Sequence, residues 1–177
     1  PDRPPKPRLR RSKWVSMDYS LPFAESGCRL FALKLSLSDE AFQPEFRPGD
    51  QIVIDPDADR LVIITEKGEP FGEENTITAV VKHVLSKTSP AKRIAAINLS
   101  TSRSVDDVVN SLGGKIFKSP VGEINVIKKM KAVKAIVGGE GSGGVILPEV
   151  HYGRDSLVGT AIILSEIAEF GGKVSGY

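Results

Sequence analysis

The strongest constraint on the fold is a strand-like run that is followed by a helix-like run. Residues 93–99 (RIAAINL) are nearly continuously apolar, which is typical of a strand buried on both faces of a sheet. Residues 104–114 (SVDDVVNSLGG) then form an apolar stripe at helical spacing and end in glycine, and Ser104 and Asp107 resemble a capping box. Strands and helices alternate in this way as far as a final helix over about 155–170. The sequence therefore predicts an α/β fold, a three-layer α/β/α domain with a mixed sheet.

The α/β pattern begins at residues 74–87 (ENTITAVVKHVLSK), which predict the first helix of this domain. His83 falls on the polar flank of that helix, so we expect it to face solvent. Upstream, short strand-like runs are separated by glycine and proline, which favours β-structure. The chain is predicted to divide into a basic, proline-rich tail over 1–13, a β-rich segment over 14–57, a connecting strand and turn over 58–73, and the α/β/α domain over 74–177.

Composition excludes several classes of protein. With 24 basic and 22 acidic residues the formal charge is +2, so no bulk field favours nucleic acid, and no helix-turn-helix pattern is visible. The basic tail suits either a solvated linker or an arm on nucleic acid or on an acidic surface. Cys28 is the lone cysteine, which excludes a disulfide framework and a cysteine-based metal cluster. We see no signal peptide and no membrane-spanning run, and we expect a cytoplasmic protein.

Three acidic residues alternate directly after an apolar strand. In the stretch IVIDPDADR (52–60), Asp55, Asp57 and Asp59 follow the strand and Arg60 closes the run. Alternate carboxylates on a turn can converge on one hard cation such as Mg²⁺. Arg60 can neutralise one of them or hold a phosphate through two hydrogen bonds. The alternative is a hairpin tip whose acids simply face water.

A glycine-rich run carries a second candidate site. The strand-like KAIVG (134–138) leads into GGEGSGG (138–144), which formally satisfies the dinucleotide-binding pattern G-x-G-x-x-G. That pattern must open a helix, whereas here a strand-like VILP follows, so we reject it. What remains is a loop that presents Glu140 and Ser142, a carboxylate beside a hydroxyl, which suits the hydroxyls of a sugar. The alternative is a glycine-rich turn with exposed polar tips.

These motifs, in this order, resemble the α-D-phosphohexomutases, the family of phosphomannomutase, phosphoglucomutase and phosphoglucosamine mutase. The resemblance covers residues 55–177: DPDADR resembles the magnesium loop, SPVGEINVIKKM (119–130) a third-domain segment, and GGEGSGGVILPEVHYGRDSLVG (138–159) the sugar-recognition loop. The resemblance implies Mg²⁺ ligands at Asp55, Asp57 and Asp59, a phosphate contact at Arg60, and sugar hydroxyl contacts at Glu140 and Ser142.

The family moves a phosphoryl group between two positions of one hexose through a phosphoserine, with Mg²⁺ offsetting the charge of the transferring group. The phosphoserine of the family lies in a domain before the metal loop, and we find no equivalent here. We therefore assign no catalytic residue. We expect the sugar-phosphate-binding portion of a Mg²⁺-dependent phosphohexomutase that is catalytically incomplete, binds Mg²⁺ weakly and takes a hexose phosphate.

The upstream half resembles a different family. The run PEFRPGDQIVIDP (44–56) is similar to the self-cleaving C-terminal domain of phage and SOS repressors, a serine–lysine peptidase. Ala41 stands where that family has its nucleophile, and alanine has no atom that can attack; Ser38 is three residues out of register. We therefore do not expect self-cleavage.

The segment IDPD (54–57) belongs to both patterns, which motivates the hypothesis of a recombined or engineered hybrid. In such a hybrid, QIVID (51–55) would pair with RLVIIT (60–65) as a hairpin. Two alternatives to a mutase function follow: a chimeric protein that folds and associates without a ligand, and a cleavage-dead, repressor-type dimerisation module. Exposed strand edges favour a homodimer formed by edge pairing.

Overall fold

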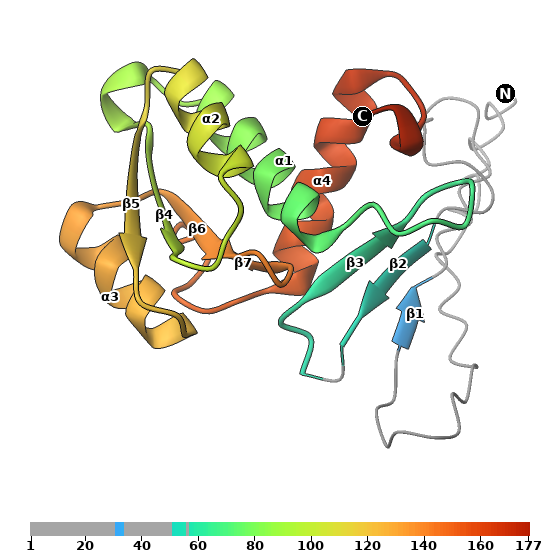
Figure 1. The fold of residues 1–177 in the computed structure, drawn as a ribbon, viewed down its shortest axis with the longest axis horizontal. Helices are drawn as coiled ribbons and strands as arrows, with labels where there is room; N and C mark the ends of the chain where they lie inside the picture. Colours follow the sequence, from blue (N-terminus) through green and yellow to red (C-terminus); the bar gives the residue numbers. More distant parts are fainter. Residues whose placement is uncertain (1–30, 34–50, 56) are drawn as a thin grey trace, which may run out of the picture.

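The computed structural model describes residues 31–33, 51–55 and 57–177 (Figure 1). The predicted basic tail over 1–13 and nearly all of the repressor-like segment over 14–57 lie outside the described residues, and with them Cys28, Ser38 and Ala41. The described residues contain two small sheets with helices packed around them.

The first sheet is antiparallel and has the order β1-β2-β3. Its strands are β1 (Phe31–Leu33), β2 (Gln51–Ile54) and β3 (Leu61–Ile64). In the register of β2 and β3, Ile54 lies opposite Leu61 and Ile52 lies opposite Ile63. The predicted hairpin between QIVID and RLVIIT is therefore confirmed, and the three aspartates lie in its connecting turn.

The second sheet has the order β5-β4-β6-β7 and is mixed. Strands β4, β5 and β6 are parallel, and β7 runs antiparallel to β6. The bounds are Ile94–Asn98 for β4, Lys115–Ser119 for β5, Val137–Glu140 for β6 and Gly144–Ile146 for β7. Parallel pairing requires crossover connections, and the predicted helices supply them.

Helices cover both faces of this mixed sheet (Figure 1). Their bounds are Glu73–Ser86 for α1, Ser104–Ser111 for α2, Glu123–Val133 for α3 and Ser156–Phe170 for α4, with short 3₁₀ turns at Pro90–Lys92 and Val174–Gly176. Helices α1 and α2 pack on one face and α3 on the other, which confirms the three-layer α/β/α arrangement. Among the described helices, none is long and apolar enough to cross a membrane.

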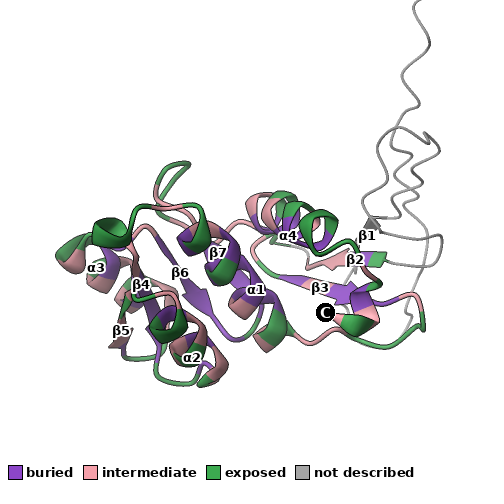
Figure 2. Ribbon diagram, turned by 90° about the horizontal axis from the view of Figure 1, so that it is seen from above, coloured by how far each residue is buried: buried purple, intermediate pink, exposed green. Residues whose placement is uncertain are grey.

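The alternation of side chains along β4 divides the core between the two faces. Figure 2 shows that β6, the neighbour of β4 in the sheet, is buried. Ala95 and Ile97 join a cluster with the predicted stripes of α1 and α2, whereas Ala96 packs with Val126 and Met130 of α3. All five are fully buried. Full burial of an aliphatic side chain such as Ile97 contributes about 1.5–3 kcal/mol, so these two clusters hold the helices to the sheet.

A third cluster joins the β2–β3 hairpin to α4 and α1. Ile52, Leu61 and Ile63 are fully buried against Ile163 and Ile167 of α4. The aspartate-bearing hairpin is thus fixed to the α/β/α domain by its own apolar face. This packing fixes the position of the turn that follows β2.

Three local predictions need correction. The capping box at Ser104 is wrong, because the N-cap of α2 is Arg103 and no side chain caps the helix. His83 is buried, with 8% exposure, because α4 covers this flank of α1. The predicted glycine loop over 138–144 is much shorter, since Gly138 to Glu140 belong to β6 and only residues 141–143 form the turn.

Candidate functional site

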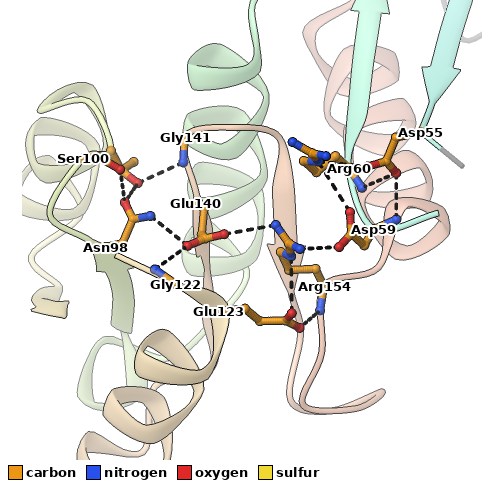
Figure 3. Close-up of polar contacts among 11 residues, drawn as sticks. Asp55, Asp59, Arg60, Asn98, Ser100, Gly122, Glu123, Glu140, Gly141 and Arg154 are labelled. Carbon is orange, nitrogen blue, oxygen red and sulfur yellow. Dashed lines mark hydrogen bonds and ion pairs between the residues drawn. The ribbon is translucent and has the colours of Figure 1, made fainter. Parts of the chain in front are cut away.

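The carboxyl ends of the parallel strands bring polar groups to one edge of the mixed sheet. Asn98 ends β4, Gly122 follows β5, and Glu140 ends β6. Parallel strands end at the same edge, and such edges commonly bind ligands in α/β folds. Figure 3 shows these groups meeting around the carboxylate of Glu140.

Glu140 is held by three donors from different elements. Its Oε1 accepts from Asn98 Nδ2 at 2.9 Å and from the backbone N–H of Gly122 at 3.2 Å. Its Oε2 accepts from Arg154 Nη1 at 3.1 Å. A carboxylate has about four acceptor positions, so this arrangement leaves one, on Oε2. The side chain is only 8% exposed, and Ser142 beside it is exposed at the tip of the β6–β7 turn.

The aspartate turn folds around its own first carboxylate. Asp55 Oδ1 accepts from the backbone N–H groups of Asp59 and Arg60, both at 3.1 Å, and Oδ2 accepts from Arg60 Nε at 2.8 Å. Ala58 takes a left-handed conformation (φ 57°) that closes the turn. Asp57 is exposed, so the three predicted metal ligands lie on one turn but in unlike environments.

The aspartate turn and the glycine turn are neighbours through backbone contacts. Arg60 forms an isolated antiparallel bridge with Gly144, and the N–H of Leu61 donates to the carbonyl of Gly143 at 3.3 Å. The start of α4 contacts the aspartate turn as well, since the Ser156 hydroxyl donates to the Ala58 carbonyl at 2.7 Å. The structure therefore brings the two predicted motifs into one site.

Arg154 connects the two turns through its side chain (Figure 3). Its Nη2 donates to Asp59 Oδ2, its Nη1 to Glu140 Oε2, and its Nε lies 3.5 Å from Glu123 Oε2. The backbone N–H of Arg154 donates to Glu123 Oε1 at 2.9 Å. One guanidinium thus faces carboxylates from the aspartate turn, from β6 and from α3.

Asp55 and Asp59 differ in the pKa of their carboxyl groups. Burial raises the pKa of Asp55, but the hydrogen bonds from Arg60 and from the backbone outweigh burial and hold the pKa below its usual range. Burial raises the pKa of Asp59, as does the neighbouring Asp55 carboxyl, against the attraction of Arg154. Asp55 is the more strongly ionised partner.

The aspartate turn suits a hard cation in its donor chemistry. Asp59 Oδ1 is shielded from solvent and accepts no hydrogen bond from the described residues; the nearest cationic group is Arg60 Nε at 3.5 Å. Buried carboxylate oxygens without a partner are costly, and a cation would satisfy this one. Asp55 and the exposed Asp57 carry the same oxygen ligands that Mg²⁺ prefers, but the three aspartates do not place one carboxylate oxygen each within 4.8 Å of one another in this structure.

Sequence reasoning missed three members of this site: Asn98, Glu123 and Arg154. Asn98 had a usable signal, because it is a polar residue at the end of an apolar strand. Glu123 and Arg154 lie within the segments 119–130 and 138–159 that resemble the mutase family, but no local pattern singles out either residue. Each makes its contacts across long sequence separations, 95 residues for Arg154 and Asp59, and periodicity does not report them.

Comparisons with known proteins show what this chain is similar to. The family model for the phosphoglucomutase/phosphomannomutase alpha/beta/alpha domain III matches residues 73–177. A phosphoglucosamine mutase of Anaplasma marginale is 35% identical over 64% of this chain and 25% of its own length. A phosphoglucomutase/phosphomannomutase of Thermococcus kodakarensis is 34% identical over 68% of this chain and 26% of its own length.

Solved structures give the same result for the fold. A phosphoglucomutase/phosphomannomutase family protein from Burkholderia thailandensis superposes with a TM-score of 0.59 and 26% identity, over 67% of this chain and 26% of that one. The chain spans about a quarter of the length of the curated relatives it matches.

Proposed function

We propose that this chain, which belongs to the phosphoglucomutase/phosphomannomutase family, carries the sugar-binding and metal-binding part of a Mg²⁺-dependent phosphohexomutase. Such an enzyme moves a phosphoryl group between two positions of one hexose phosphate. The observation that carries the proposal is the meeting of the aspartate turn and the β6–β7 turn, joined by Arg154 at the carboxyl edge of the sheet.

Glu140 is the proposed sugar acceptor. Its remaining acceptor position on Oε2 receives one hydroxyl of the hexose, while Asn98 and Gly122 fix the orientation of the carboxylate. Ser142, exposed at the turn, contacts a second hydroxyl. A carboxylate fixed by protein donors loses little conformational entropy on binding, which favours affinity for a polyol.

Arg60 is the proposed phosphate contact. Its side chain is 49% exposed, so its Nη groups reach solvent while Nε holds Asp55. A guanidinium in this position can take two phosphate oxygens at once. Asp55, Asp57 and Asp59 are the residues that would hold Mg²⁺, which when bound offsets negative charge on the transferring phosphoryl group.

The proposal predicts binding without turnover by this chain. No described residue is assigned to carry the phosphoryl group, so we expect no conversion of glucose 1-phosphate to glucose 6-phosphate. The test of binding is an amide-resolved NMR titration with glucose 1-phosphate, with and without Mg²⁺. We expect shifts at residues 140–144, and Mg²⁺-dependent shifts at residues 57–60.

Glu140→Gln is the variant that separates a sugar site from general surface binding. We expect it to lose the shifts at the β6–β7 turn, because an amide nitrogen replaces one acceptor oxygen. Glu149→Gln is the matched control, since Glu149 is exposed and follows β7 at the opposite edge of the sheet. A folded sample that shows no shifts at millimolar glucose 1-phosphate would refute the proposed function.

A second candidate is self-association through a strand edge, with no ligand. β1 is an outer strand of the antiparallel sheet and pairs only with β2 among the described strands. A free strand edge can pair with a second copy. Light scattering over a range of protein concentrations tests this candidate: a ligand-independent dimer supports it, and a monomer at every concentration rejects it.

A further inference from the structure

The guanidinium of Arg154, at the centre of the site, is surrounded by three carboxylates. Arg154 faces Asp59, Glu123 and Glu140, and the three carboxylates come from three separate elements. The Arg154 side chain is only 20% exposed, so little water screens these interactions. This guanidinium supplies positive charge where the aspartate turn meets the sheet.

The contact with Asp59 competes directly with a cation. Asp59 Oδ2 accepts from Arg154 Nη2, whereas Oδ1 is buried and accepts no hydrogen bond from the described residues. One carboxylate oxygen therefore points to the Arg154 guanidinium, and the other lies 3.5 Å from Arg60 Nε without a hydrogen bond and can accept a further ligand. A divalent cation at this carboxylate would meet the positive charge of Arg154 at close range, which is unfavourable in a half-buried site.

We propose that Arg154 is an internal counterion that substitutes for the metal at Asp59 and must leave Asp59 when a divalent cation binds. The inference rests on the proposed function, because it takes the aspartate turn as the cation site. Arg154 keeps Glu140 and Glu123 as partners after leaving Asp59. Its Nη2 then has a free donor for an anionic oxygen, such as one from the phosphate of the sugar. Arg154 is therefore a positioning residue: cation binding at Asp59 changes the position of its guanidinium, which also holds Glu140, the carboxylate that receives the sugar.

The test is the affinity for Mn²⁺, a paramagnetic probe that accepts the same oxygen ligands as Mg²⁺. Arg154→Gln removes the competing charge and keeps a side chain that can hydrogen bond. We expect this variant to bind Mn²⁺ roughly fivefold more tightly than the unaltered chain. The cation then no longer has to break the ion pair between Arg154 and Asp59, which is partly screened by solvent. Arg154→Lys keeps the charge, and we expect its Mn²⁺ affinity to stay near that of the unaltered chain.

The lysine variant distinguishes competition from a structural role. A merely structural Arg154 would make both variants bind Mn²⁺ more weakly, because the turn would lose its support. Lys92→Gln is the control for net charge, since Lys92 is exposed and precedes β4 at the opposite edge of the sheet. Equal or weaker Mn²⁺ binding by Arg154→Gln would overturn the inference, and so would an equal gain in Lys92→Gln.

A second measurement keeps the inference testable even if Arg154→Gln unfolds. In the unaltered chain, added Mg²⁺ must change the Nε–Hε NMR signal of Arg154 together with the amide signals of residues 57–60. An Arg154 signal that stays constant while the aspartate turn shifts would show that the guanidinium does not move, and would refute the inference.

The two proposals fail separately. Glucose 1-phosphate is titrated into the same samples. Tighter Mn²⁺ binding by Arg154→Gln without any sugar-phosphate binding supports the counterion and rejects the proposed function. Sugar-phosphate binding with equal Mn²⁺ affinity in all variants supports the proposed function and rejects the counterion. Absence of Mn²⁺ binding in every variant at millimolar metal also rejects the counterion.

Discussion

Glu166 is a buried carboxylate on α4 that receives three donors from other parts of the chain. Its Oε1 accepts from the Tyr177 hydroxyl at 2.6 Å and lies 2.9 Å from Lys82 Nζ, and its Oε2 lies 2.8 Å from His83 Nδ1. The side chain is 8% exposed. This cluster connects α1, α4 and the C-terminal turn, so Glu166→Gln should loosen the packing of α4.

The expected loss of stability follows from these contacts. Glutamine has the size of glutamate and keeps an oxygen acceptor, so no cavity forms. Each of the three contacts loses its charge assistance, which is worth roughly 0.5–1 kcal/mol per bond. The sum is about 2 kcal/mol, which for a chain of this length lowers the unfolding midpoint by about 4–8 °C.

The dependence of this loss on pH gives a sharper test. Burial raises the pKa of Glu166, but the hydrogen bonds from Tyr177, Lys82 and His83 outweigh it and hold the pKa below the ordinary value of 4.5. A carboxyl whose pKa is lowered on folding stabilises the fold above its unfolded-state pKa. That contribution is lost as the pH falls through the folded-state pKa. The difference between the unaltered chain and Glu166→Gln is therefore full at neutral pH and closes in acid.

The assay is thermal unfolding of both proteins, followed by circular dichroism from neutral pH down to about pH 3. Glu169→Gln is the matched control on the same helix. Glu169 pairs with Lys87 at 2.5 Å, but its side chain is 55% exposed, so we expect a loss under about 0.5 kcal/mol. A midpoint for Glu166→Gln equal to that of the unaltered chain at neutral pH, or a difference that persists unchanged in acid, would refute the reasoning.

Three further predictions concern single positions. Gly138→Ala would place a methyl group 2.5 Å from both a backbone carbonyl oxygen and Met130 Sδ, so we expect a loss of about 1–3 kcal/mol in urea unfolding; Gly176→Ala, with no atom within 4 Å, is the neutral control. Asp155→Ala removes the side chain that caps α4 by accepting from two backbone N–H groups, at a cost of about 1 kcal/mol that Asp155→Ser should largely restore. Burial first, and then Glu166, raise the pKa of Tyr177 to about 12, so its phenolate absorbance should appear only in strong alkali, and a transition for this residue near pH 10 would contradict the burial.

The helices were predictable because their signals are local. Apolar residues at helical spacing placed α1 within a residue of its observed bounds, and the predicted final helix over about 155–170 matches α4. Gly171 does take the left-handed conformation (φ 67°) that ends α4. Such patterns depend only on residues that are close in the sequence, so these helices can be predicted without knowledge of tertiary contacts.

Strand β6 shows where a local signal fails. The predicted strand over 134–138 stops two residues before the end of the observed one, because glycines have little preference for strands and resemble a loop. They lie in a strand here because the backbone of β6 passes so close to β4 and Met130 that no β-carbon fits at Gly138. The reason for the glycine is a contact across the sheet, which the sequence around it does not show.

His83 and Arg154 depended on partners that are distant in the sequence. The helical pattern put His83 on a polar flank correctly, but α4 covers that flank and Glu166, 83 residues away, becomes its partner. Arg154 gains its role from three carboxylates on three elements. A polar residue in an amphipathic pattern can be solvated or paired inside the protein, and only the packing of the elements decides between them.

At the site, backbone contacts hold the two turns together, whereas side-chain ion pairs can exchange when a ligand binds. The aspartate turn is held against the β6–β7 turn by the bridge between Arg60 and Gly144 and by the hydrogen bond from Leu61 to Gly143, which involve backbone atoms alone. The apolar face of the hairpin is buried on α4. The position of the two turns therefore does not require the ion pairs of Arg154. A cation or a sugar phosphate can exchange those ion pairs without separating the turns, and the binding free energy need only cover the movement of one guanidinium.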